Sequence, residues 1–479
     1  MDGPTLSMGY SSLYEKMLRD SEGSMHPTIW QAFAAQAETF ESTLRERPVL
    51  PTLDPAALRG ELARRYDFAE PVPAGRLLDE VGGLLAEGLV HVTHPRYFGL
   101  FNPSVLPVSV LGEALTALYN PQLAVWSHAP AACELEYRAL TALQGLIGWG
   151  PGDAVGNFTS GGMESNASAL QCALAWRFPG WDEEGLTALG LRPTLYVSAD
   201  AHHSFVKAAR AAGLGTGAVR VAPMDARRRL DPAALEALIA GDRAAGRHPF
   251  MVVATLGATG TGVIDPAGPL RECADRHGLW LHADAAWGGG ALLSPRLRPA
   301  LAGIERADSV TWDAHKWMSV PMGSGMFFCR HREAVRRAFA ISAAYMPSPQ
   351  DAEGVLDPFS STAQWSRRAI GLKVFMAMAE LGLEGYGRLI DGQAQLGELL
   401  RRRLVQEGWT LANETPLPVV CFHRDGVDVP ALLGRVLGAG RVWLSSLALP
   451  GGPMVLRACI TSYHSTAADV EELLAALRA

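Results

Sequence analysis

Lysine is scarce in this sequence of 479 residues and occurs only at positions 16, 207, 316 and 373. Positive charge as a whole is slightly outnumbered, because 42 Lys+Arg stand against 49 Asp+Glu and the formal net charge is -7. No basic tract is interleaved with aromatic residues. Proteins that bind a phosphate backbone are usually more basic than this. We therefore expect no nucleic-acid partner.

Long apolar runs and cysteine pairs are absent as well. No uninterrupted apolar stretch reaches about 18 residues, and the N-terminus has no basic region followed by an apolar run. We therefore expect a cytoplasmic protein that does not cross a membrane. The cysteines lie far apart without a CxxC motif, which argues against disulfides and against a zinc site. We predict buried free thiols and no metal; the cysteines are Cys133, Cys172, Cys273, Cys329, Cys421 and Cys459.

The hydrophobic pattern divides the chain into three predicted parts. Residues 1–90 favour helices with little core of their own, over residues 29–45, 51–65 and 77–89. Residues 91–345 alternate short apolar runs with Ala/Leu-rich stretches, which is typical of βα units around a mostly parallel sheet. Residues 346–479 begin with a Pro-containing loop up to residue 365, long enough for a functional flap. A helix over residues 368–381 then leads into a small C-terminal α+β domain.

Four apolar runs in the central part are the clearest predicted strands. They cover residues 194–198, 250–255, 279–283 and 309–312, and each is followed by a residue able to do chemistry. Ligands of open α/β sheets bind beyond the carboxyl ends of the strands. We therefore expect the residues after these runs to form one site.

Asp284 and Lys316 follow the last two of these runs. Asp284 precedes Ala285 and Ala286, which are small enough to admit a flat ring, although a strand-end Asp more often caps a turn. Lys316 has apolar and aromatic neighbours in the sequence, and lysine is rarely buried without a reason. A partly desolvated lysine becomes nucleophilic towards a carbonyl group. The alternative for Lys316 is an ordinary surface lysine.

Two further elements complete a constellation. Gly161 and Gly162 precede an Ala/Leu-rich helix, so that backbone N–H groups and the helix dipole could receive a phosphate, or simply form a turn. His202 follows residues 194–198 and could stack on a ring, although a lone histidine there is more often structural. An amine, a carboxylate, an anion cradle and a ring platform are the parts that pyridoxal 5′-phosphate (PLP) requires.

With these parts identified, the sequence resembles the group II PLP-dependent decarboxylases of fold type I, the family of the aromatic amino acid and glutamate decarboxylases. The matching segments stand in family order at residues 158–166, 201–204, 254–259, 280–287 and 313–317. The resemblance implies PLP as the cofactor and a mostly parallel seven-stranded central sheet. It also implies an amino-acid substrate and a homodimer with the site at the subunit interface, to which the N-terminal helices contribute.

The resemblance also implies a role for individual residues. Lys316 would form the Schiff base (internal aldimine), Asp284 would pair with the pyridine nitrogen, and His202 would stack on the ring. Tyr345, just before the Pro-containing loop, matches a catalytic tyrosine that returns a proton to Cα. The remaining matched positions are Gly161, Gly162 and Met163 in the phosphate turn, His315, Thr259 and Ala286 near the cofactor, and Phe101, Asn102 and Ser104 around the substrate side chain.

Three positions depart from the family pattern. Met163 stands where many relatives have a hydroxyl residue, so backbone amides would carry more of the phosphate binding. Asp313 stands where some relatives have Asn, and a negative charge near a phosphate is unfavourable unless it is paired. Asn102 replaces an aromatic residue of the aromatic-acid enzymes, which makes aromatic specificity unexpected.

The resulting hypothesis is decarboxylation of an L-amino acid to an amine and carbon dioxide, through a Schiff base at Lys316 and a quinonoid. Alternatives on the same scaffold are an aldehyde-forming oxidative deaminase, or an aminotransferase or other PLP lyase in which Arg457 binds the α-carboxylate. A structural role for Arg457 is equally open. A cofactor-free binding protein is the alternative from a different class.

Overall fold

The computed structural model describes residues 28–51, 53–341 and 357–478. The chain divides into two compact units, Met1–His91 and Val92–Ala479. Tyr345 lies outside the described residues, as does the predicted boundary between residues 345 and 346 and the first half of the predicted loop.

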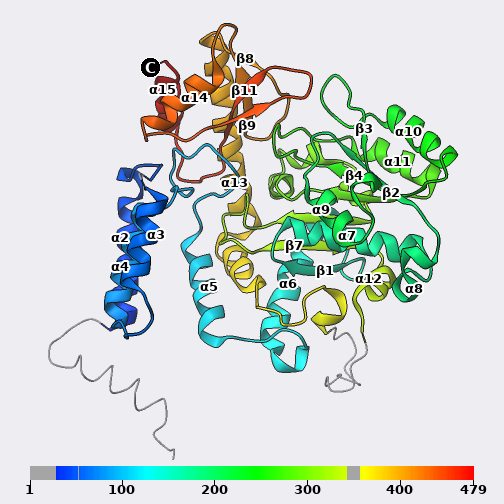
Figure 1. Ribbon diagram of the computed structural model, residues 1–479, viewed down its shortest axis with the longest axis horizontal. Coiled ribbons are helices and arrows are strands. Elements are labelled where there is room, and N and C mark those ends of the chain that lie inside the picture. The colour runs from blue at the N-terminus through cyan, green and yellow to red at the C-terminus, as the bar shows by residue number, and fades with distance from the viewer. Residues whose placement is uncertain (1–27, 52, 342–356, 479) are drawn as a thin grey trace, which may run out of the picture. The chain divides into compact units, whose positions relative to one another are not determined.

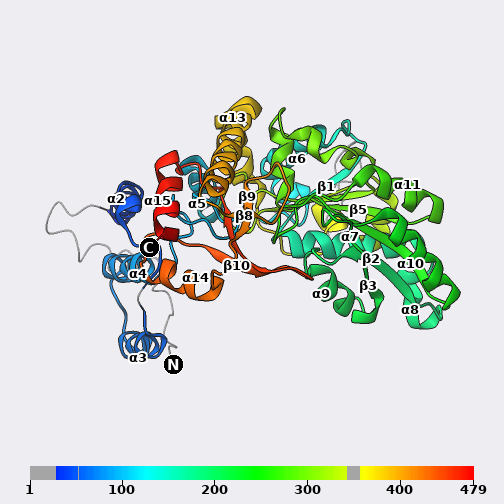
Figure 2. The ribbon, with the colours of Figure 1, turned by 90° about the horizontal axis from the view of Figure 1, so that it is seen from above.

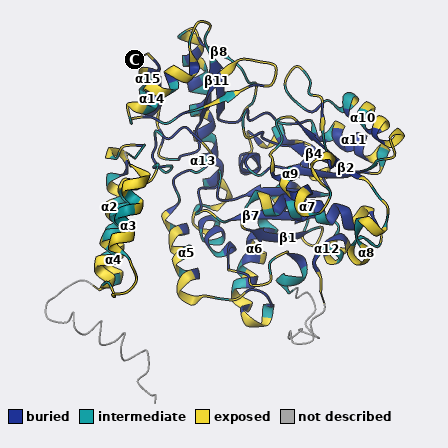
Figure 3. Ribbon diagram, viewed as in Figure 1, coloured by how far each residue is buried: buried dark blue, intermediate teal, exposed yellow. Residues whose placement is uncertain are grey.

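The first unit contains the three predicted helices, α2 (Ile29–Thr43), α3 (Pro55–Arg65) and α4 (Ala74–Gly88). The Asp54-Pro55 pair starts α3, because the Asp54 side chain accepts a hydrogen bond from the N–H of Ala56 at 2.9 Å. None of the residues within these three helices is buried, as Figure 3 shows. The prediction that this segment has little core of its own is therefore confirmed.

The second unit is organised by a seven-stranded sheet in the order β1-β7-β6-β5-β4-β2-β3 (Figure 1). The strands from β3 to β6 run parallel to their neighbours, whereas β7 and β1 are antiparallel. The mostly parallel seven-stranded sheet is thus confirmed. The strands are β1 (Val155–Thr159), β2 (Pro193–Ser198), β3 (Val219–Ala222), β4 (His248–Thr255), β5 (Trp280–Asp284), β6 (Ser309–Asp313) and β7 (Gly325–Cys329).

Helices cover both faces of this sheet, as Figure 2 shows. One face packs against α7 (Gly162–Arg177), α9 (Ser204–Ala211) and α12 (Arg332–Phe339), with α8 (Trp181–Ala188) at its edge. The other packs against α6 (Pro130–Ile147), α10 (Pro232–Ala244) and α11 (Ala267–His277). Side chains of β4 alternate between the two cores, with Met251 in one and Val252 in the other. Burial on both sides explains why the predicted strands are continuous apolar runs.

The sheet begins later in the chain than the sequence pattern suggests. The described residues between 92 and 154 form α5 (Pro107–Tyr119) and α6, and the first strand begins at Val155. Pro107 and Pro130 each occupy the first turn of their helix, where the missing N–H of proline costs nothing.

The C-terminal part contains a small antiparallel sheet in the order β10-β11-β9-β8. Its strands are β8 (Thr410–Leu411), β9 (Val419–His423), β10 (Ser445–Ala448) and β11 (Met454–Cys459), packed with α14 (Val429–Gly438) and α15 (Ala467–Arg478). The long helix α13 (Gly371–Gln406) links it to the large sheet. The predicted end at residue 381 is confirmed for the first segment of this helix, because Gly382, with φ 61° and ψ 170°, is not helical; a second helical segment then continues to Gln406.

All six cysteines are free and buried. Within the described ranges, no helix combines the length and the apolar character needed to cross a membrane.

Candidate active site

Three sequence-distant segments meet at the carboxyl ends of β5 and β6. Asp284 ends β5, and Lys316 follows the end of β6 at Asp313. The Nζ atom of Lys316 lies 3.0 Å from Oδ2 of Asp313 and 5.9 Å from the centre of the Phe101 ring. The strand ends thus place an amine and two carboxylates at one edge of the sheet, and the Phe101 ring lies beside the amine. The roles expected of Lys316, Asp284 and Phe101 stay predictions.

Asp284 is nearly fully buried and accepts two hydrogen bonds. Its Oδ1 accepts from the N–H of Ala286 at 3.1 Å, and its Oδ2 accepts from Nδ2 of Asn166 at 2.9 Å. A carboxylate has about four lone-pair directions. Asp284 can therefore receive a further N–H, such as that of a pyridinium ring, without losing either partner.

His202 lies on the loop between β2 and α9. Its Nδ1 accepts a hydrogen bond from the N–H of Ser204 at 3.2 Å, which fixes the orientation of the ring. Partial burial lowers the pKa of His202, and the nearby Asp284 carboxylate opposes this effect. An imidazole that stays neutral at pH 7 is suited to stacking on a flat, positively charged ring.

The turn between β1 and α7 forms a cradle that only glycine leaves open. A Cβ atom on Gly162 would lie 2.9 Å from Oδ2 of Asp313 and 3.3 Å from Cβ of Ala286, and one on Gly161 would lie 3.2 Å from Cε1 of His315. The first N–H groups of a helix have no acceptor within it, and with the helix dipole they favour an anion. The residues present therefore fit the phosphate of PLP, and His315 lies at this cradle as predicted.

Residues 65–424 match the family model described as the pyridoxal-dependent decarboxylase conserved domain. The chain belongs to this family. It is a PLP-dependent amino-acid decarboxylase, and the predicted family, fold, cofactor and reaction class are confirmed.

Known proteins similar to this decarboxylase include enzymes named for acidic substrates. Cysteine sulfinic acid decarboxylase from Mus musculus is 35% identical over 336 residues, covering 70% of this chain and 68% of that protein. The acidic amino acid decarboxylase GADL1 from Bos taurus is 32% identical, covering 70% of this chain and 64% of that protein. The crystal structure of mouse CSAD superposes with a TM-score of 0.87 at 28% identity, covering 98% of this chain and 99% of that one.

The contacts of Asp313 show how the decarboxylase accommodates a carboxylate at position 313. Its side chain is buried and its Oδ2 pairs with Lys316, while Oδ1 is buried without a hydrogen-bond partner. The negative charge of Asp313, which the sequence analysis considered unfavourable near a phosphate, is thus paired with Lys316. It leaves one oxygen atom unsatisfied beside the Gly162 cradle.

The predicted substrate residues take different positions. Phe101 stacks on Trp287 with 4.5 Å between ring centres, and Asn102 donates from Nδ2 to Sδ of Met322. Ser104 is buried, and its hydroxyl donates to the carbonyl of Thr93, so it is engaged within the protein. Its predicted contact with substrate stays a prediction.

Thr259 and Met163 are both exposed. Thr259 lies on the loop after β4, where its carbonyl accepts from Nη2 of Arg457 at 2.8 Å. Its predicted position beside the phosphate stays a prediction. Met163 lies in the first turn of α7, so its backbone belongs to the cradle.

Arg457, on β11, connects the small sheet to this site. It donates from Nε to the carbonyl of Gly260 at 2.9 Å, from Nη2 to Thr259 and from Nη1 to the carbonyl of Gly99. Its guanidinium lies 5.1 Å from the centre of the Phe101 ring. Within the described part of the chain no carboxylate lies within ion-pair distance of Arg457, although the side chain is buried.

The sequence prediction missed Asn166, His282 and Trp287 as individual participants. Asn166 bonds to both Asp284 and His282, and Trp287 lies between Phe101 and Trp317 in a stack. Two of them carry a signal in the sequence. His282 precedes Asp284 by two residues and so faces the same side of β5, and Asn166 stands on the first turns of α7.

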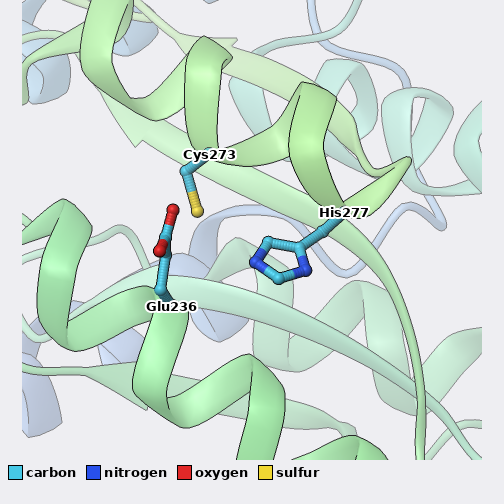
Figure 4. A group of neighbouring side chains, drawn as sticks. All are labelled: Glu236, Cys273 and His277. Carbon is cyan, nitrogen blue, oxygen red and sulfur yellow. The ribbon is translucent and has the colours of Figure 1, made fainter.

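A separate group of possible metal ligands, Glu236, Cys273 and His277, lies between α10 and α11 (Figure 4). Glu236 is already paired with the guanidinium of Arg276, and Arg243 donates to the carbonyl of His277 at 2.7 Å. Burial raises the pKa of Cys273 to about 11, so its thiol is protonated at neutral pH. With two guanidinium groups in place and no thiolate, we assign this group to ion pairing between helices.

Proposed function

We propose that this decarboxylase acts on a small acidic L-amino acid and releases carbon dioxide and the corresponding amine. The observation that carries the proposal is the buried charge of Arg457 beside Phe101. A guanidinium has five N–H donors, and the three bonds to backbone carbonyls leave two of them for an anionic substrate group. A buried charge is stabilised by such a partner, whereas a neutral or aromatic side chain would leave it unpaired.

The names of the relatives support the same substrate class. Those relatives act on cysteine sulfinic acid and on acidic amino acids by name. The side chain of Asn102, in place of an aromatic residue, agrees with a short polar substrate. We propose that Arg457 binds the acidic side chain of the substrate, while Phe101 and Asn102 flank it.

When bound, PLP supplies an aldehyde that receives an amine and a ring that accepts electrons as the Cα–carboxylate bond breaks. We propose that Lys316 provides the amine that holds the cofactor and yields its place to the substrate. Asp284 keeps a proton on the ring nitrogen, His202 covers one face of the ring, and the amides of residues 161–163 bind the phosphate with His315, Thr259 and Ala286 nearby.

We propose that Tyr345 delivers the proton to Cα, directly or through His202. A Tyr345→Phe variant should then form less amine and, with oxygen present, more aldehyde, ammonia and hydrogen peroxide. Wild-type enzyme should release carbon dioxide without hydrogen peroxide. If the wild-type enzyme releases as much hydrogen peroxide as carbon dioxide, the result would instead favour the oxidative deaminase.

A homodimer in the cytoplasm is also proposed. Exposed apolar side chains on the first unit, among them Trp30, Phe33 and Leu85, need cover that a second copy would supply. Buried, unpaired thiols agree with a reducing compartment. Sedimentation of the purified protein as a monomer at micromolar concentration would contradict the dimer.

The substrate proposal is tested by following carbon dioxide release from cysteine sulfinate, aspartate, glutamate, tyrosine and tryptophan. We expect turnover of one or more acidic substrates and none of the aromatic ones. Arg457→Met should lower kcat/KM for the acidic substrate at least about 30-fold, because truncating a buried charge pair costs roughly 2 kcal/mol or more.

Arg401→Met is the matched control for this variant. Arg401 also donates to two backbone carbonyls in the C-terminal part, those of Leu417 and Val419, but makes no contact with the substrate residues. Equal loss of activity in both variants, or faster turnover of an aromatic amino acid by the wild type, would contradict the proposal.

A further inference from the structure

Alternation along β5 and β6 places a row of polar side chains on one face of the sheet. Trp280, His282 and Asp284 are spaced two residues apart on β5 and so point to the same side. The register pairs His282 with Ser309 on β6. Helix α7 covers this face and contributes Asn166, and all five side chains are buried.

These side chains are joined by four consecutive hydrogen bonds. Nε1 of Trp280 lies 2.8 Å from Oγ of Ser309, and that oxygen lies 2.8 Å from Nδ1 of His282. Nε2 of His282 lies 3.1 Å from Oδ1 of Asn166. Nδ2 of Asn166 lies 2.9 Å from Oδ2 of Asp284.

The chemistry of the two ends fixes the direction of every bond between them. An indole N–H can only donate and a carboxylate can only accept. Asn166 must therefore present its amide N–H to Asp284 and its oxygen to His282, which requires the proton of His282 on Nε2. Nδ1 then accepts from the hydroxyl of Ser309, which accepts in turn from Trp280.

The histidine in the middle remains neutral. Complete burial lowers the pKa of His282 to about 4, although the Asp284 carboxylate opposes this effect. A neutral imidazole carries one N–H and one acceptor nitrogen, as this arrangement requires. His202, on the loop before α9, is a second titratable group that interacts with Asp284.

We infer that Trp280, Ser309, His282 and Asn166 form a directed hydrogen-bond relay that positions the Asp284 carboxylate and keeps it as a hydrogen-bond acceptor towards the ring nitrogen. Each bond points its positive end towards Asp284, and bonds in a chain polarise one another. The proton between Asp284 and the pyridine nitrogen of PLP is thereby held on the ring, where it supports electron withdrawal. This inference rests on the proposed pairing of Asp284 with that nitrogen.

The experiment uses holoenzyme reconstituted with PLP that carries ¹⁵N in its ring. The ¹⁵N chemical shift reports ring protonation, and the visible absorbance reports the pH at which the Schiff base of the wild type titrates. We expect Asn166→Leu to bind PLP, to move the ¹⁵N signal towards the unprotonated ring, and to raise the absorbance midpoint by about one pH unit. The midpoint rises because a less positive ring disfavours the protonated Schiff base less strongly.

The relay predicts that the shifts of both signals become smaller as the substituted residue lies further from Asp284, which a purely structural role would not produce. His282→Leu and Ser309→Ala should shift both signals in the same direction by successively smaller amounts, and His282→Gln, which keeps an N–H donor, should recover part of the loss. Ser168→Ala is the matched control on α7, because among the described residues the Ser168 hydroxyl bonds to the carbonyl of Glu164 and to no member of the relay. It should leave both signals unchanged.

Wild-type signals in Asn166→Leu, or an equal shift in Ser168→Ala, would overturn the relay. If Asn166→Leu does not fold, the order of the His282 and Ser309 variants decides, and absence of a shift in both overturns the relay. Asp284→Asn separates this outcome from failure of the site assignment. If that variant keeps a protonated ring, the proposed pairing of Asp284 fails, and the relay with it.

Discussion

Asp313 and Lys316 form an ion pair in which Oδ2 and Nζ are 3.0 Å apart, and the second carboxylate oxygen of Asp313 is buried without a partner. The same carboxylate borders the Gly162 cradle proposed for the phosphate of PLP. With PLP bound as proposed, the Asp313 carboxylate would face the phosphate anion. The resident carboxylate should therefore weaken cofactor binding.

The first prediction is that Asp313→Asn binds PLP more tightly than the wild type. Removing one of two facing negative charges should lower Kd at least about tenfold, equivalent to roughly 1.4 kcal/mol. Titration of the apoenzyme with PLP measures this. Asp308→Asn, directly before the same strand and paired with Arg271 and His331, should lose stability and keep the wild-type Kd. Weaker PLP binding by Asp313→Asn would contradict the charge argument.

The second prediction concerns the site of covalent attachment. After borohydride reduction of the holoenzyme, peptide mass spectrometry should find the PLP adduct on Lys316. Lys316→Ala should carry no adduct and retain less than about 0.1% of activity, because it removes the amine that is proposed to bind the cofactor covalently and to take part in the reaction. Lys207→Ala removes an exposed lysine on α9 and should retain both. An adduct on any other lysine would refute the assignment of Lys316.

The third prediction tests the phosphate cradle. Gly162→Ala would place a Cβ atom 2.9 Å from the Asp313 carboxylate, so PLP affinity should fall about tenfold or more through over-packing. Gly145→Ala is the matched control, because a Cβ atom on this glycine of α6 meets no atom within 4 Å. It should raise stability by about 0.5–1 kcal/mol and leave PLP binding unchanged. Unaltered Kd in Gly162→Ala would place the phosphate elsewhere.

The fourth prediction is a pH dependence of stability that originates in His282. Its pKa falls from 6.5 to about 4 on folding. Between these values the unfolded chain binds the proton and the folded chain does not, so the free energy of unfolding should fall by about 3 kcal/mol as pH drops from 6.5 to 4. His282→Gln should flatten this slope in Tm scans. His128→Gln, at an exposed position, should keep it, and a wild-type slope in His282→Gln would refute the assignment.

Local signals account for the parts that the sequence predicted well. The Asp54-Pro55 pair marks a helix start by itself, and residues 250–255 form an apolar run because both faces of β4 are covered. The approach of Asp284 to Lys316 follows from parallel strands ending at one edge. These features depend on neighbouring residues or on the fold class.

The proposed relay to Asp284 could not be predicted from such local signals. Asn166 and His282 are 116 residues apart, and their bond exists only because α7 lies across β5. Their places on β5 and α7 can be read from the sequence, but the bond between them cannot. The engagement of the Ser104 hydroxyl with the Thr93 carbonyl and with Ser462 is likewise decided by tertiary packing. The sequence predicts where the strands end, but it does not predict which side chains form hydrogen bonds to the residues at those ends.

The kink of α13 at Gly382 has a consequence for substrate selection. Before the kink, Gly371 and Lys373 lie against α6 and α5; beyond it, Ile390 still packs in the core of the large sheet, and Leu400 and Leu404 pack in the core of the small sheet. Gly382 has φ 61° and ψ 170°, a backbone conformation that residues with a Cβ rarely adopt. A residue with a Cβ atom at this position would favour a straighter helix and would therefore rotate the small sheet. Arg457, on β11, would move with this sheet, so Gly382 would help to set the distance between the guanidinium proposed to bind the substrate anion and the amine proposed to hold the cofactor.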